Sequence, residues 1–403
     1  MRASPFALCL VLLLVTAAQA ADSLNVRLIG NCDTPGLAMG VAVRGDCAFV
    51  ADWSSGLRVI TVADPAHPTE VGHSDGPDSA LALVVSGGYA YVVGMQAGLR
   101  VISVEDSTHP IEVGRYDTPG LATSVAVNGD YAYVADLDSG LWVISVTDPA
   151  NPTEVGHWQE SGGMTADIAV AGHFVYVVDY LHGLRVISVA DPASPVEVGH
   201  NDSVGFAAVA VEGGYAYVGN NENGLFVVSL ADSARPVEVG WCDTHEPVQS
   251  VAVGDYACAI GSSRLCVVSR SDPAHPDTVG HYERLGWNAN GLATSGDYVY
   301  VTTDYGLSVC QRYEVGVEEA TNADLRVANC EPTVIRRVLS LDGVGTRSGL
   351  SDNPVMSRAA LLDISGRNVM DLRLGANDVS VLAPGVYFVS EWPGSIRKVV
   401  VAR

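Results

Sequence analysis

The chain has 403 residues, 48% of them hydrophobic, and a formal net charge of -24 at pH 7. This length allows large buried cores, and ordinary domain sizes would predict two or three domains. The acidic excess lies within residues 21–319, whereas residues 320–403 carry slightly more basic than acidic side chains. Because an acidic surface repels phosphate backbones and anionic lipid headgroups, we expect no nucleic-acid partner and no membrane-surface partner.

The first twenty residues have the pattern of a secretory signal. Arg2 supplies a positive start, residues 6–15 an apolar segment, and residues 18–20 a small-residue motif that predicts cleavage before Ala21. Beyond it, no stretch reaches about 18 uninterrupted apolar residues, so we expect no transmembrane span in the mature chain. The predicted location is extracellular or on the outer-membrane surface.

One stretch of about 42 residues recurs seven times. Its clearest copy reads DYAYVAD at residues 130–136, GLWVISV at 140–146, DPANP at 148–152 and EVGH at 154–157. A period this regular indicates a repeat architecture. The second aromatic position of YAYV recurs at steps of 42, 42, 43, 41, 41 and 42 residues, at Phe49, Tyr91, Tyr133, Tyr176, Tyr217, Cys258 and Tyr300.

Each copy resolves into four short strands. Apolar residues alternate within each run, and Gly, Asp or Pro bounds it, so the third copy predicts strands at residues 124–127, 131–135, 141–146 and 153–157. The DPAxP loop places an aspartate where it can cap the turn. Four strands in about 42 residues are typical of a β-propeller blade. The seven innermost strands are expected to start near Leu37, Ala80, Leu121, Met164, Gly205, Pro247 and Asn290.

The two ends of the repeat array complement each other. The last copy stops after its third strand, near Tyr313, and lacks an EVG strand. Residues 26–36, at the other end of the array, match the register of residues 112–120. We therefore predict that residues 24–32 close the ring as the outer strand of the seventh blade, which removes the exposed edges of an open array.

The GLRVI run, seen at Gly56, Gly98 and Gly183, resembles the LVIVD repeat when its YVAD and DPxxP surroundings are included. The resemblance covers residues 24–315, and the sixth copy departs most, because GSSRLC at 261–266 lacks the glycine before leucine. It implies an all-β, seven-bladed extracellular β-propeller, usually of undefined activity. The expected propeller domain spans residues 21–315, after a signal peptide at residues 1–20.

The repeat register ends at residue 315, and residues 316–324 are predicted to form an acidic linker. The spacing of short strands in residues 325–403 is typical of a small β-sandwich. The runs LLDISGRNV at 361–369, LAPGVYFV at 382–389 and RKVVV at 397–401 resemble the C-terminal sorting domain of type IX secretion cargo. That resemblance implies recognition by the outer-membrane secretion machinery. The strands are expected at residues 334–341, 359–364, 379–382, 385–390 and 396–401.

Seven cysteines remain after removal of the signal, an odd number that leaves at least one thiol unpaired within the chain. Cys258 and Cys266 face each other across a predicted hairpin centred near Ser262. Two interpretations are open: the pair forms a disulfide, or both residues are small buried strand residues. No CxxC pair is present, which excludes a zinc ribbon.

Signatures of catalysis and of metal binding are missing from the sequence. It contains no HExxH motif and no Walker loop. Four histidines suggest a metal cluster until the copies are superposed, when each occupies the same outer-strand position of a different blade: His73, His157, His200 and His281. No cofactor is predicted, although a bound divalent cation such as calcium is compatible with the acidic loops.

The copies differ most in the loops after their second and fourth strands, which gather on one face of a propeller. Such variation indicates a surface that is free of packing constraint or used for recognition. Its aromatic, acidic and amide side chains suit stacking on sugars, cation capture or a basic protein partner; the alternative is that these loops supply only turn residues. The candidate ligand-binding residues are Asp52, Trp53, Asp136, Asp138, Asp179, Tyr180, His182, Asn220, Asn221, Trp241, His245, Trp287, Asp304 and Tyr305.

Three functional hypotheses follow from this pattern. The first is a monomeric, non-enzymatic, secreted or cell-surface propeller that binds a protein or glycan through its variable face. The second is a hydrolase or lyase acting on extracellular polysaccharide, in which Asp136, Asp179 or Asp304 would act with His182 or His245 at the channel mouth. The third is a spacer whose face binds nothing.

Overall fold

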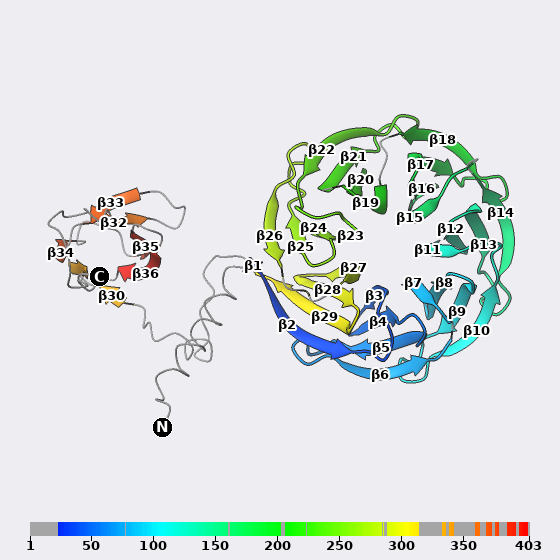
Figure 1. Ribbon diagram of the computed structural model, residues 1–403, viewed down its shortest axis with the longest axis horizontal. Helices are drawn as coiled ribbons and strands as arrows, with labels where there is room; N and C mark the ends of the chain where they lie inside the picture. Colours follow the sequence, from blue (N-terminus) through cyan, green and yellow to red (C-terminus); the bar gives the residue numbers. More distant parts are fainter. Residues whose placement is uncertain are drawn as a thin grey trace, which may run out of the picture. The chain divides into compact units, whose positions relative to one another are not determined.

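Seven antiparallel sheets stand around a common axis, one for each repeat (Figure 1). The computed structural model describes residues 23–313, except residues 77, 160–161, 203–205, 223, 284 and 286–287, and the strands of the C-terminal region. The chain separates into two compact units, Met1–Val315 and Gly316–Arg403. No helix among the described residues has the length and hydropathy required to cross a membrane.

In the first six blades, the four strands of the repeat run in chain order from the channel outwards, as the repeat predicts. The first three blades are β3 (Gly40–Arg44), β4 (Cys47–Ala51), β5 (Leu57–Thr61) and β6 (Thr69–Ser74); β7 (Ala80–Ser86), β8 (Tyr89–Gly94), β9 (Gly98–Ser103) and β10 (Ile111–Tyr116); and β11 (Ala122–Asn128), β12 (Tyr131–Asp136), β13 (Gly140–Ser145) and β14 (Thr153–Trp158). The next three are β15 (Thr165–Ala171), β16 (Phe174–Asp179), β17 (Gly183–Ser188) and β18 (Val196–Asn201); β19 (Phe206–Glu212), β20 (Tyr215–Asn220), β21 (Gly224–Ser229) and β22 (Val237–Cys242); and β23 (Ser250–Val253), β24 (Ala257–Ile260), β25 (Leu265–Val268) and β26 (Thr278–Tyr282).

The seventh blade joins the two ends of the propeller. Its inner strands are β27 (Ala289–Ser295), β28 (Tyr298–Thr303) and β29 (Gly306–Arg312), and its outer strand is β2 (Val26–Asp33). In the antiparallel register, Val26 lies opposite Arg312 and Asp33 opposite Gly306. The predicted ring closure is therefore confirmed. A short strand that was not predicted, β1 (Ser23–Leu24), pairs with β26 and gives the sixth blade a fifth strand.

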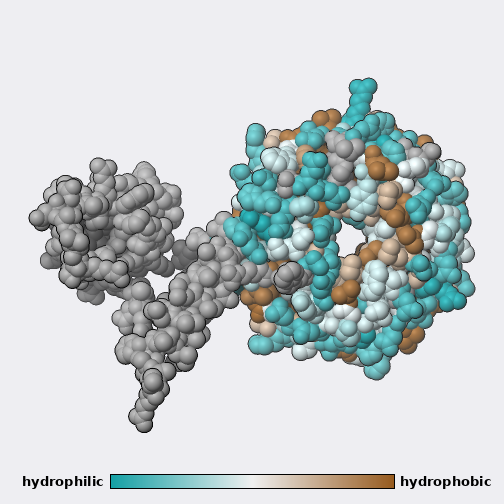
Figure 2. Space-filling model, viewed as in Figure 1, coloured by the Kyte–Doolittle hydropathy of each residue, from teal (hydrophilic) through white to brown (hydrophobic). Residues whose placement is uncertain are grey.

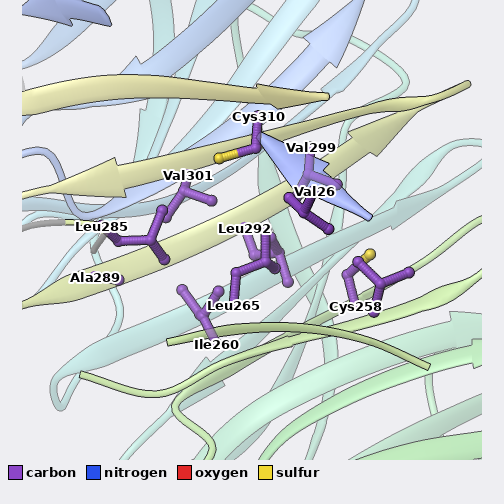
Figure 3. Packing of buried hydrophobic residues seen from close by; sticks show 11 residues of the cluster. Val26, Cys258, Ile260, Leu265, Leu285, Ala289, Leu292, Val299, Val301 and Cys310 are labelled. Carbon is purple, nitrogen blue, oxygen red and sulfur yellow. The ribbon is translucent and has the colours of Figure 1, made fainter. Parts of the chain in front are cut away.

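Apolar side chains fill each of the seven interfaces between neighbouring blades. Every cluster of buried residues combines side chains from two adjacent sheets. Between blades six and seven, Val26, Ile260 and Val301 pack with Cys258 and Cys310 (Figure 3). The second strand of a repeat is buried on both faces because a blade is covered on each side by a neighbour.

The proposed Cys258–Cys266 disulfide is wrong, and the alternative of two buried strand residues is confirmed. Cys258 lies opposite Val267, and Cys266 lies opposite Ala259, one residue away from the predicted pairing. A shift of one residue places the two side chains on opposite faces of the sheet. Both thiols are free and buried.

Each outer strand carries a register shift beside a glycine, which in most blades is that of the EVG motif, as in β14 next to Gly156. A Cβ atom added at Gly156 would lie 2.5 Å from the backbone oxygen of Pro192, in the DPAxP-type loop of the next blade. At Gly72 it would overlap the backbone oxygen of Ser107. The glycine thus allows the neighbouring turn to approach closely.

The C-terminal unit contains a five-stranded sheet in the order β30-β36-β35-β32-β33 and a two-stranded sheet of β31 and β34. Two strands were not predicted, β33 and β34, and the strand expected at residues 379–382 lies outside the described residues. The β-sandwich stays a prediction. The seven strands are β30 (Thr333–Ile335), β31 (Val338–Leu341), β32 (Ala359–Leu362), β33 (Asn368–Leu372), β34 (Gly375–Asp378), β35 (Gly385–Glu391) and β36 (Ser395–Val401).

Candidate functional site

The loop face carries the turns between second and third strands, and most of these turns begin at a buried polar residue. The carboxylate of Asp52 accepts hydrogen bonds from the hydroxyl of Thr34, at 2.6 Å, and from the N–H of Gly36, at 2.8 Å. Asp136 accepts the N–H of Gly120 at 2.9 Å. These buried carboxylates join each turn to the segment that enters the same blade, and so they act as turn residues.

Asp179 has the same position and the most hydrogen bonds. Its carboxylate accepts the N–H groups of Met164 at 2.5 Å, Leu181 at 2.8 Å and His182 at 2.9 Å. The ring Nδ1 of His182 lies 3.0 Å from the same carboxylate. Equivalent pairs recur in the turns after third strands, so this pairing reflects local turn geometry: Asp64 with His67, Asp106 with His109, and Asp272 with His275.

In each blade, one residue directly follows the position of Asp52, Asp136 or Asp179. We call these seven residues the mouth ring. In blades one, two, three and six the backbone of this residue bridges to the next blade, as in the 3.1 Å bond from the N–H of Trp53 to the oxygen of Ala80. Blades one to four supply apolar or aromatic side chains, and blades five to seven supply polar ones. In blade order the mouth ring consists of Trp53, Met95, Leu137, Tyr180, Asn221, Ser262 and Asp304.

Several other predicted residues of this face are accessible. Tyr305 exposes 62% of its surface, and the neighbouring loop residue Leu181, which was not predicted, exposes 53%. Asp138 and His245 are also exposed. The backbone of His245 has a φ of 65°, and its N–H is bound by the carboxylate of Asp243 at 2.7 Å.

Not all candidate residues belong to the mouth of the channel. Asn220 is buried, and its side-chain oxygen accepts the N–H of Glu222 at 2.6 Å. Trp241 lies on the outer strand β22, where its ring packs against Phe226 with a centroid distance of 6.5 Å. Trp287 lies outside the described residues.

A channel passes through the centre of the ring (Figure 2). It forms a cavity of about 470 Å³ lined by residues from all seven innermost strands. Among the described residues of this lining, one side chain is acidic: Asp167 of β15. It was missed in the sequence, although superposing the copies would have revealed it as the one acidic residue at a position that otherwise holds glycine, alanine or serine.

Hydrogen bonds from three blades hold the Asp167 carboxylate. It accepts the hydroxyl of Ser124 at 2.6 Å, the N–H of Ile168 at 2.9 Å and the N–H of Val209 at 2.8 Å. Burial nevertheless raises the pKa of Asp167, because removal from water disfavours the charged form. Among the described residues, no group of three or more His, Cys, Asp or Glu side chains is arranged to hold a metal ion.

These features define the class of protein: a closed seven-bladed β-propeller with a variable loop face and a central channel. The model of the LVIVD repeat matches residues 35–75, 78–118, 119–159, 162–203, 207–244, 247–284 and 286–310. The chain therefore belongs to the LVIVD repeat family.

Solved structures show the same fold at low identity. U3-55K is 14% identical over 72% of this chain and 98% of its own, with a TM-score of 0.58. The WD40 repeats of RRP9 are 14% identical over 72% and 97%, with a TM-score of 0.57. The computationally designed Ika8 protein is 8% identical over 71% and 100%, with a TM-score of 0.54. No curated protein sequence matches the chain.

Proposed function

We propose that the chain is a secreted or cell-surface, non-enzymatic propeller that binds a protein or glycan through its loop face. The observation that carries this proposal is the mouth ring. At one structural position, seven otherwise similar repeats present four apolar or aromatic residues on one side and three polar residues on the other. A scaffold of equal repeats does not require such an asymmetry.

Exposed apolar surface next to the mouth ring supports recognition. Leu37, Met164, Tyr180, Leu181 and Tyr305 all belong to loop-face segments and all count among the exposed large hydrophobic residues. Apolar side chains that gather on one face and have polar neighbours are typical of a binding surface. Aromatic rings there can stack on sugars or enter a pocket of a protein partner.

A hydrolase or lyase is supported less well by the geometry. Asp136 and Asp179 are buried, and their carboxylates accept backbone N–H groups. The channel lining includes neither of them, nor Asp304. Asp304 instead accepts a hydrogen bond from the side chain of Asn288 at 2.9 Å.

The proposal includes a route of export. The N-terminal signal pattern would direct the chain out of the cytoplasm. Residues 325–403 would then act as a β-sandwich sorting domain recognised by a type IX secretion machinery, and the mature protein would be released or attached to the cell surface. The sequence runs that resemble this domain support the assignment.

A binding screen tests the function. Mature protein, residues 21–403, is applied to arrays of bacterial and host glycans and of extracellular proteins. We expect selective retention of one ligand class. Retention of nothing on either array would contradict the proposal and favour a spacer.

A further inference from the structure

The central channel contains a carboxyl group that the propeller scaffold does not require. On the inner strands, the position of Asp167 is defined by its partner Val178 on β16. The equivalent residues in the other six blades are small and uncharged: Gly40, Ala82, Ser124, Ala208, Ser250 and, beside the bulge of β27, Gly291. Six blades therefore form the same ring without a carboxylate.

The lining of the channel offers Asp167 no positive partner. Its hydrogen bonds come from one hydroxyl and two backbone N–H groups, and the part of the lining that the structure describes contains no Arg, Lys or His. A carboxylate has about four acceptor sites, so these three donors leave capacity for a fourth. An opposite charge within about 4–6 Å would favour the charged form of this half-buried carboxyl group.

We propose that the channel binds a small organic ammonium ion, with the ammonium group at Asp167 and the apolar body along the channel wall. The wall supplies Leu81, Leu83, Val125 and Leu292 as apolar surface. A cavity of about 470 Å³ lies within the usual range for small-molecule sites, about 300–1,000 Å³.

Tyr180 completes the site at the loop-face mouth. It lines the same cavity, and burial, followed by the neighbouring Asp167 carboxylate, raises the pKa of its phenol. The phenol therefore stays neutral at pH 7, and its ring can bind a cation over its face.

An organic cation fits the channel better than a metal ion does. Calcium prefers six to eight oxygen ligands, including several carboxylates. The channel lining supplies one carboxylate, the neutral side chains of Thr123, Gln249, Ser250 and Asn290, and a large share of apolar wall. This inference does not depend on whether the loop face binds a macromolecule.

The test compares benzylamine, which is a cation at pH 7, with its neutral analogue benzyl alcohol. Binding to the full mature chain is measured by calorimetry and by saturation-transfer NMR. We expect one saturable site for benzylamine, at least ten-fold weaker binding of benzyl alcohol, and loss of benzylamine binding in Asp167→Ala. That variant restores the residue type present in blades two and five, so the ring should fold, which a thermal unfolding scan checks.

Glu238→Gln is the matched control, because it removes one negative charge from the exposed outer strand β22 and should leave binding unchanged.

In the wild type, benzylamine binding should weaken as the pH falls through the raised pKa of Asp167; Tyr180 is the other titratable residue of the lining. Equal binding of the alcohol, full binding by Asp167→Ala, or no benzylamine binding at millimolar concentration would overturn the proposal. Displacement of benzylamine by calcium alone would overturn it in favour of a metal site.

Discussion

Asp52 was predicted to bind a ligand, but its side chain instead stabilises a loop by hydrogen bonds. Both of its carboxylate oxygens accept hydrogen bonds, and the side chain is fully buried. Replacing Asp52 with Ala would leave the hydroxyl of Thr34 and the N–H of Gly36 without their acceptor. We expect a loss of about 1–3 kcal/mol in the free energy of unfolding, measured by urea denaturation.

Asp138 is the matched control for this prediction, because it lies in the equivalent turn of the third blade but is exposed. Asp138→Ala should change the free energy of unfolding by less than about 0.5 kcal/mol. Equal effects of the two substitutions would show that Asp52 does not act through its buried hydrogen bonds.

The buried thiols lead to a second prediction at this scale. Burial raises the pKa of Cys258 and Cys310 to about 12 and that of Cys266 to about 11. Because the thiolate is the reactive form, these three residues should resist iodoacetamide at pH 8 in the native protein and react after unfolding in urea. Peptide mapping by mass spectrometry identifies each site, and rapid native labelling of Cys258 would contradict the structure.

Individual residues also mark where the sequence is informative and where it is not. YVAD predicts a strand that ends in a turn, but it does not show whether the aspartate points to solvent or to backbone N–H groups. The disulfide prediction was wrong because Cys258 pairs with Val267, one residue beyond the predicted partner Cys266. Variation among the loops does not reveal Asp167, because this residue lies within an inner strand.

At the scale of elements, the glycine of the outer strand determines how closely two blades approach. Gly72→Ala would introduce a Cβ that overlaps the backbone oxygen of Ser107 in the next blade. We expect a loss of about 1–3 kcal/mol in the free energy of unfolding. Gly76→Ala is the control four residues later, where the nearest atom, Glu112 Oε2, is 3.4 Å away. A Gly72 variant as stable as the Gly76 variant would contradict the close packing of the bulge.

The elements themselves were largely predictable, because seven copies repeat the same alternation and the same turn residues. Strand bounds in the third blade differ from the predicted ones by at most two residues. Ring closure by β2 could be predicted because residues 26–36 keep the repeat register. By contrast, β1 is only two residues long, which is too short to show an alternation of apolar and polar residues. The sequence therefore could not predict its pairing with β26.

At the scale of the whole molecule, the two units are proposed to have separate tasks: the propeller recognises a ligand, and the C-terminal unit directs export. Deleting residues 325–403 should leave the propeller folded but retained in the periplasm of a host that has a type IX machinery. Cell fractionation and immunoblotting measure this, with the full-length chain as reference. Equal surface or culture-medium levels of both proteins would contradict the assignment of the C-terminal unit.

The most direct test of the loop-face proposal compares two pairs of equally exposed apolar residues. Tyr305 and Leu181 lie on the loop face and are 62% and 53% exposed, whereas Ile111 and Val196 lie on outer strands and are 63% and 54% exposed. The measurement is the dissociation constant for the ligand retained in the binding screen. The double variant Tyr305→Ser with Leu181→Ser should bind at least ten-fold more weakly, and Ile111→Ser with Val196→Ser should bind like the wild type. Unchanged affinity in the first variant, or an equal loss in both, would contradict recognition through the loop face.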